Sequence, residues 1–100
     1  MIGDFFMTLR RFIIEREIPK VGTLDREQLR GAAAKSNSVL QVLGPDIQWV
    51  QSYVTADKIF CIYLAANESI IRTHADMSGF PASKITEVRK VIDPTTEQPD

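Results

Sequence analysis

Hydrophobic and polar residues alternate, or gather in short β-branched runs, along four stretches of the chain, and they recur at helical spacing along two others. Strands are predicted for residues 11–17, 47–55, 58–66 and 85–92. Between them, the helical spacing predicts a first helix before Gly44 and a second before Gly79. The resulting order, β-α-β-β-α-β, predicts an α+β protein of ferredoxin-like type: an antiparallel sheet with two helices on one face.

Both predicted helices have recognisable ends. Asp25 is expected to cap the first helix, with Gln28 as its capping-box partner three residues later. Asn67 is expected to cap the second helix. Gly44 and Gly79, each followed closely by a proline, are expected to end the two helices.

The side chains of a strand point alternately to the two faces of its sheet, and this alternation predicts one apolar face and one mixed face. The apolar set, expected under the helices, is Phe12, Ile14, Val50, Val54, Phe60, Ile62, Leu64, Val88 and Ile92. The mixed set, expected on the uncovered face, is Ile13, Glu15, Glu17, Ile47, Trp49, Gln51, Tyr53, Ile59, Cys61, Tyr63, Ile85, Glu87, Arg89 and Val91. So many uncovered aromatic and aliphatic side chains would form a large apolar patch, which normally marks an interface or a ligand groove.

A second copy of the chain is the simplest cover for the mixed face, because a two-fold contact is self-complementary. The pattern therefore predicts a homodimer of the α+β barrel type, with a cavity between or beside the two sheets. The side chains expected to contact a small molecule there are Glu15, Gln51, Tyr53, Cys61, Tyr63, Glu87 and Arg89. A plain hydrophobic interface with charges at its rim and no ligand is the alternative.

His74 is the single histidine of the chain and the candidate metal ligand or proton carrier, because imidazole titrates near neutral pH. The alternative is a histidine at the edge of the core that bonds to the backbone. For an enzymatic function, Glu15, Glu87 or His74 would act as the general base, a carboxylate doing so in a dry cavity, and Tyr53 or Tyr63 would donate a proton.

Composition excludes several classes of protein. The 100 residues carry a net charge of −1, which gives no electrostatic footprint for nucleic acid. The lone Cys61 excludes an internal disulfide, fits a reducing compartment and, between apolar neighbours, is expected to behave mainly as a small buried hydrophobe. No apolar run approaches the roughly 20 residues needed to span a bilayer. We expect a cytoplasmic protein that binds neither nucleic acid nor membranes.

The two ends of the chain differ in composition from its centre. Residues 1–8 are interpreted as an N-terminal leader with an acid, Asp4, where a signal peptide would carry positive charge. Residues 94–100 are polar and rich in proline and predict a disordered tail. Residues 9–93 are left as a single ferredoxin-like domain.

Six short segments, at residues 47–55, 60–63, 71–75, 79–82, 85–88 and 91–95, stand in an order and spacing typical of one group of proteins. In these segments the chain resembles a family of small bacterial proteins catalogued as a domain of unknown function, some of which are named nickel-binding proteins. The similarity covers roughly residues 9–96. It implies a ferredoxin-like fold and a dimer, and it names a divalent metal ion, nickel, as a candidate ligand.

The nickel-binding members of that family carry additional histidines, including on the first helix, whereas residues 25–37 of this chain contain none. In some relatives a histidine stands where this chain has Gln51. Because Ni²⁺ prefers imidazole ligands, a site here would need carboxylates, Cys61 or a second subunit besides His74. We expect a small dimeric ligand- or metal-binding protein with its pocket on the uncovered face. A cofactor-independent isomerase or oxygenase, and a protein that only associates, are the alternatives.

Overall fold

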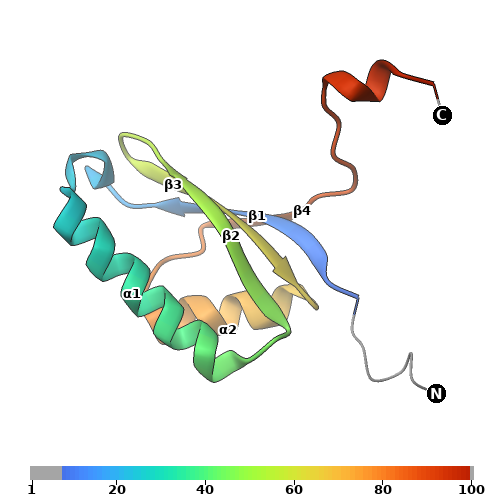
Figure 1. The fold of residues 1–100 in the computed structure, drawn as a ribbon. Coiled ribbons are helices and arrows are strands. Elements are labelled where there is room, and N and C mark those ends of the chain that lie inside the picture. The colour runs from blue at the N-terminus through green and yellow to red at the C-terminus, as the bar shows by residue number, and fades with distance from the viewer. Residues whose placement is uncertain (1–7, 100) are drawn as a thin grey trace.

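The computed structural model describes residues 8–99 and contains a four-stranded antiparallel sheet with two α-helices. The elements are β1 (Arg10–Glu17), η2 (Val21–Thr23), α1 (Arg26–Leu43), β2 (Ile47–Val54), β3 (Lys58–Ala65), α2 (Glu68–Ser78), β4 (Lys84–Glu87) and η3 (Pro94–Glu97). The strand order is β2-β3-β1-β4, and both helices lie against one face of the sheet (Figure 1). The predicted α+β architecture is confirmed, and the observed order is compatible with a ferredoxin-like fold.

The predicted helix ends are present. The Asp25 side chain accepts a hydrogen bond from the Gln28 amide at 2.8 Å, and the Gln28 side chain accepts one from the Asp25 amide at 3.0 Å. The Asn67 side chain accepts a bond from the first turn of α2. Gly44 and Gly79 end the two helices with φ values of 85° and 79°, which glycine adopts without a steric penalty.

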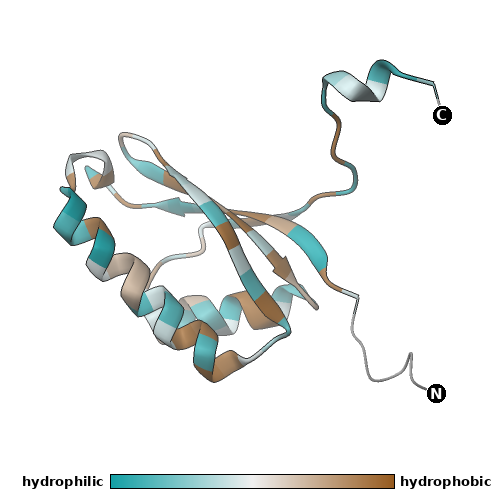
Figure 2. Ribbon diagram, in the orientation of Figure 1, coloured by the Kyte–Doolittle hydropathy of each residue, from teal (hydrophilic) through white to brown (hydrophobic). Residues whose placement is uncertain are grey.

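The hydrophobic core lies between the sheet and the helices, where the two central strands meet α2. Its buried members are Phe12, Ile14, Ile47, Cys61, Tyr63, Ala65 and Ile71. Apolar and polar positions alternate along α1 (Figure 2), and Leu40 and Leu43 pack against this core. In the part of the chain that the structure describes, no helix is both long and apolar enough to cross a membrane.

The strand register corrects the predicted sheet faces. Phe12 pairs with Tyr63 and Ile14 pairs with Cys61, so Tyr63 and Cys61 point toward the helices and not toward the uncovered face. The face without helices, called the open face from here on, instead carries Phe60, Ile62 and Leu64 from β3. Because β3 is apolar at every position from Ile59 to Ala65, either set of alternate residues could face the helices. The sequence therefore does not distinguish the two sets, and the predicted set is wrong.

The same correction extends to the flanking strands. Five more residues that were expected on the uncovered face lie on the helix side, together with Phe12 and Ile14. They are Ile47, Trp49, Ile59, Ile85 and Glu87. In β2 the register shifts between Trp49 and Gln51, which inserts an extra residue, Val50. This β-bulge reverses the alternation, so Trp49 and Gln51 point to opposite faces although they stand two residues apart.

The last strand is shorter than the predicted 85–92, because β4 ends at Glu87. Glu87 is opposite Phe12, and the amide of Val88 makes one further bond to the Arg11 carbonyl. Because β1 and β4 are antiparallel and β1 starts at Arg10, the residues after Val88 have almost no strand left to pair with. Arg89, a predicted ligand contact, is therefore exposed and lies beyond the sheet.

The chain after β4 runs away from the domain to the short 3₁₀ helix η3 (Figure 1). Part of this extended segment is hydrophobic (Figure 2), and its Val91 and Ile92 are exposed. The sequence indicates disorder over residues 94–100. Within this segment the structure has the helix η3, which Asp93 caps by accepting a hydrogen bond from the Thr95 amide at 2.8 Å. Of the predicted leader 1–8, residues 1–7 lie outside the described residues.

Two glycines offer a matched test of packing. A methyl group on Gly22 would lie 2.7 Å from the Thr55 carbonyl oxygen, because η2 packs on the β2–β3 turn. On Gly31, within α1, it would meet nothing within 4 Å. We expect Gly22→Ala to lower the free energy of unfolding by about 1–3 kcal/mol. Gly31→Ala should raise it by up to about 1 kcal/mol. Urea denaturation measures both, and changes of the same sign would contradict this packing.

Candidate functional site

A charged side chain is buried on the helix side of the sheet. Arg16 stands two residues after Ile14 on β1, and it is only 3% exposed. Its Nη1 donates to the carbonyl oxygens of Pro81 at 2.9 Å and Phe80 at 3.3 Å, and its Nε donates to Cys61 Sγ at 3.4 Å. Its Nη2 is also buried but has no hydrogen-bond partner within residues 8–99. The guanidinium thus links β1, β3 and the segment after α2 and keeps one amino group unbonded.

No carboxylate of the described residues lies within 4.0 Å of this guanidinium. Arginine stays protonated in proteins, so burial cannot be relieved by loss of the proton. Burying a charge costs several kcal/mol unless it is well paired. The unbonded Nη2 of Arg16 is therefore an unusual polar group among the described residues.

A second polar group lies between the two helices and β3. His74 on α2 is fully buried, and its Nε2 lies 3.1 Å from Ser36 Oγ on α1. Ser36 Oγ is in turn 3.5 Å from the Tyr63 hydroxyl, and the rings of Tyr63 and His74 meet edge to face at 5.4 Å. His74 Nδ1 is buried without a partner in the described part of the chain.

Burial sets the charge state of these side chains. Burial, helped by the nearby Arg16 charge, lowers the pKa of His74 to about 4. Burial also raises the pKa of Tyr63 above its usual value. At neutral pH the imidazole is therefore neutral and the phenol is protonated, so Arg16 is the one of these three groups that carries charge.

A cavity of about 590 Å³ lies between α1 and the sheet, next to Arg16. Among its lining side chains are Leu29, Ala32, Ala33 and Ser36 of α1, and Trp49, Ile59 and Tyr63 of the sheet. Exposed residues at its margin, such as Pro19 and Val54, bring it to the molecular surface. The site is thus an apolar hollow with a buried cation in its wall.

A smaller hollow of about 420 Å³ lies at the end of α2. Its charged lining residues, Arg72 and Asp76, are both exposed, and none of its lining side chains is a buried polar group. Arg72 is moreover paired with Glu68 at 2.8 Å. Its chemistry is that of an ordinary charged surface, so the cavity beside Arg16 is the better candidate site.

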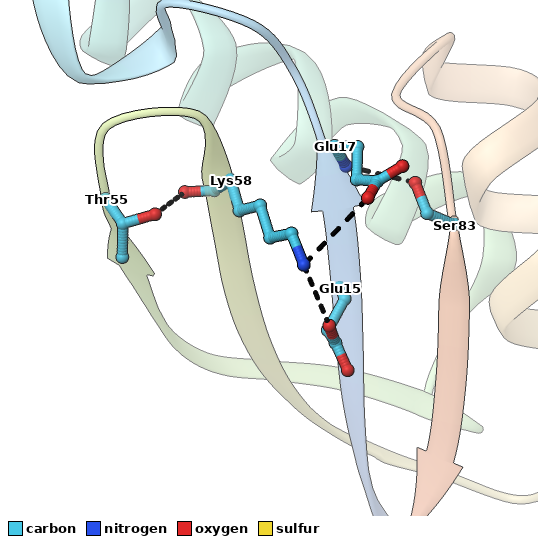
Figure 3. A network of polar contacts seen from close by, with 5 residues as sticks. All are labelled: Glu15, Glu17, Thr55, Lys58 and Ser83. Carbon is cyan, nitrogen blue, oxygen red and sulfur yellow. Dashed lines mark hydrogen bonds and ion pairs between the residues drawn. The ribbon is translucent and has the colours of Figure 1, made fainter.

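The predicted open-face residues form surface contacts instead of a site. Lys58 Nζ lies 3.6 Å from a carboxylate oxygen of Glu15 and 3.9 Å from one of Glu17 (Figure 3). Gln51 donates a hydrogen bond to the Tyr53 hydroxyl, and both residues are exposed. Exposed ion pairs of this kind contribute about 0–1 kcal/mol to stability.

The structure does not bring the predicted site residues together. Cys61 and Tyr63 line the cavity, and His74 reaches Tyr63 through Ser36. Glu15, Gln51 and Tyr53 lie on the open face, on the other side of the sheet. Glu87 lies on the helix side, where it pairs with Arg10 at 2.9 Å. Glu15 and Glu87, two of the candidate bases, are therefore separated by the sheet.

The sequence reasoning missed the residue that defines the site. Arg16 stands between Glu15 and Glu17, and such a run of charged residues is typical of a solvated surface. A signal was available, since Arg16 continues the alternation of Phe12 and Ile14 and therefore falls in phase with the core. Ser36 stands at helical spacing from Leu29 and Leu40, which indicates burial but gives no signal of its hydrogen bond to His74.

The possible metal ligands among residues 8–99 do not come together into a metal centre. Among the described residues, no three His, Cys, Asp or Glu side chains gather in a way that could hold a metal ion. His74 Nε2 already meets Ser36, and Arg16 donates to the Cys61 sulfur and would repel a cation there. The residues present therefore do not fit a divalent metal ion.

Fold and cavity define a small α+β protein with a four-stranded antiparallel sheet and two helices, an arrangement compatible with a ferredoxin-like fold. A family model described as "Nickel responsive protein SCO4226-like" matches residues 12–88, so the chain belongs to the SCO4226-like family. The match confirms the predicted relation to a small bacterial family. The fold is similar to the crystal structure of SCO4226 from Streptomyces coelicolor A3(2), with a TM-score of 0.70 and 15% sequence identity. That alignment covers 82% of this chain and 99% of the other. No curated protein matches the chain.

The depressed pKa of His74 makes stability depend on pH. Between pH 6.5 and about 4 the unfolded chain binds a proton at His74 that the folded chain does not bind, so stability falls as the pH is lowered. We expect a loss of about 2 kcal/mol between pH 7 and pH 5, at about 1.4 kcal/mol per pH unit.

His74→Leu should be less stable at pH 7 but should lose this slope, because the chain has no other histidine. Urea denaturation at several pH values measures both proteins. Parallel pH profiles for the wild type and the variant would contradict the assignment.

Proposed function

We propose that this chain is a small-molecule-binding protein whose site is the cavity between α1 and the sheet. The observation that carries the proposal is a hollow of about 590 Å³ with a mostly apolar wall and one buried cation. Ligand sites typically measure about 300–1,000 Å³ and combine apolar walls with a few fixed polar groups. The pocket is thus moved from the open face, where we expected it, to the helix side. The cytoplasmic location stays a prediction from the sequence.

The family description supports a relation to nickel, but not a binding site in this chain. The description speaks of a response to nickel, and the single histidine is buried, neutral and bonded to Ser36. Direct nickel binding would require donors from a second copy, and nothing in the donor set of residues 8–99 favours it. We therefore rest the proposal on the apolar cavity.

Binding in the cavity can be tested with a neutral fluorescent probe. N-phenyl-1-naphthylamine should emit more strongly and at shorter wavelength with the wild type, and it should change the emission of Trp49, the single tryptophan, which lines the cavity. Ala33→Phe places a ring in the cavity and should abolish both signals. Ala34→Phe makes the same change at the neighbouring exposed position and should keep them. Equal binding by the two variants would overturn the proposed site.

We also propose that two copies associate through their open faces. Four apolar side chains, Ile13, Phe60, Ile62 and Leu64, lie together on the two central strands of that face and are only partly buried in the monomer. Tyr53 beside them is 54% exposed. Charges of both signs surround this patch, including Lys58 and Glu15, so a two-fold axis can pair unlike charges.

The oligomeric state tests this association. Light scattering should give twice the mass of the chain for the wild type. Ile62→Lys places a charge at the centre of the open face and should yield a monomer, because an unpaired charge buried in an interface costs several kcal/mol. Val42→Lys, at a position of α1 that is 73% exposed, should leave the dimer intact. A monomeric wild type would refute the association.

A further inference from the structure

We propose that the natural ligand of the cavity is an organic monocarboxylate with an apolar body, and that the buried guanidinium of Arg16 binds its carboxylate group. This inference rests on the proposed function and deepens it, because it names the chemical class of the ligand. The observation behind it is a cation that lines a ligand-sized cavity, is 3% exposed, and leaves one terminal nitrogen unbonded within the described residues.

The bonds of Arg16 show which part of the guanidinium remains for a ligand. Nε is engaged by the Cys61 sulfur, and Nη1 is engaged by the Phe80 and Pro81 carbonyls. These bonds fix the plane of the guanidinium, so Nη2 is held in one direction without a partner. A fixed donor on a charged, planar group is the type of site that recognises a carboxylate oxygen.

The charge of the wall favours one negative charge on the ligand. Arg16 is the basic residue among those that line the cavity, and Glu17 is the acidic one. Glu17 is itself exposed, and its carboxylate lies 3.9 Å from Lys58 Nζ (Figure 3). Within residues 8–99 no carboxylate compensates the buried charge, and a single carboxylate of a ligand balances it. A phosphate dianion would bring a second charge for which the cavity wall has no cation.

The rest of the wall defines the body of the ligand. Leu29, Ala33 and Ile59 offer aliphatic surface, and Trp49 offers an aromatic one. Ser36 and Tyr63 also line the cavity, and their hydroxyl oxygens lie 3.5 Å from each other. The wall thus suits a chain or ring of carbon atoms whose charged end meets Arg16.

Competition for the cavity tests the ligand class in the wild-type protein. Decanoate, 1-decanol and decylammonium share one apolar chain and differ in the charge of the head group. Each displaces N-phenyl-1-naphthylamine at pH 8, where decanoate is ionised. We expect decanoate to bind about 10- to 100-fold more tightly than decanol, which is the range for hydrogen bonds to a charged group. Decylammonium should bind more weakly than decanol, because the Arg16 charge repels it.

Two variants then assign the preference to Arg16. Arg16→Met removes the charge and should bring decanoate and decanol to equal affinity, while the probe still binds. Arg11→Met removes a charge from the same strand on the open face and should keep the wild-type preference. Circular dichroism verifies folding. If Arg16→Met does not fold, the affinities of the wild type for the three ligands test the carboxylate inference by themselves.

The outcomes separate this inference from the proposed function. Binding of the probe with equal affinity for decanoate and decanol would overturn the carboxylate inference and leave the binding site in place. Failure of the probe to bind the wild type would overturn both. A preference for decanoate that survives in a folded Arg16→Met protein would also refute the role of Arg16.

Discussion

The buried guanidinium of Arg16 is the constraint around which the helix side of this fold is arranged. Removing such an ion from water costs several kcal/mol, which its hydrogen bonds offset only in part. These bonds join β1 to β3 and to the chain after α2, so one charge ties three segments together. Opposite it, α1 presents the small residues Ala32, Ala33 and Ser36, and the volume they leave unfilled is the cavity.

Local signals in the sequence were sufficient to predict the elements and their order. The capping residues Asp25 and Asn67 and the terminal glycines act within one helical turn, so their effect can be read without the tertiary structure. The side to which each strand residue points is not a local property when both phases are apolar, as in β3. The bulge at Val50 and the end of pairing after Glu87 depend on partner strands distant in sequence.

The candidate site was predictable only in fragments for the same reason. Cys61 and Tyr63 were chosen as cavity residues, but on the wrong face, and His74 was chosen for its titration near neutral pH, which burial abolishes. Glu15 lies with Tyr53 on the open face and Glu87 lies on the other side of the sheet, so neither of these candidate bases lines the cavity. The chain belongs to a family that is described by a response to nickel. Its own candidate site, however, is an apolar pocket with one cation.

The irregularity in β2 has a consequence for how copies of the chain can meet. An outermost strand normally presents a row of N–H and C=O groups that an additional extended chain can adopt. In β2 that row is interrupted midway, between Trp49 and Gln51, and the outermost strand on the other side, β4, is only four residues long. Neither margin is a continuous template for fibril growth. The association that we propose through the open face uses neither margin, and a two-fold contact there closes after two subunits and does not propagate.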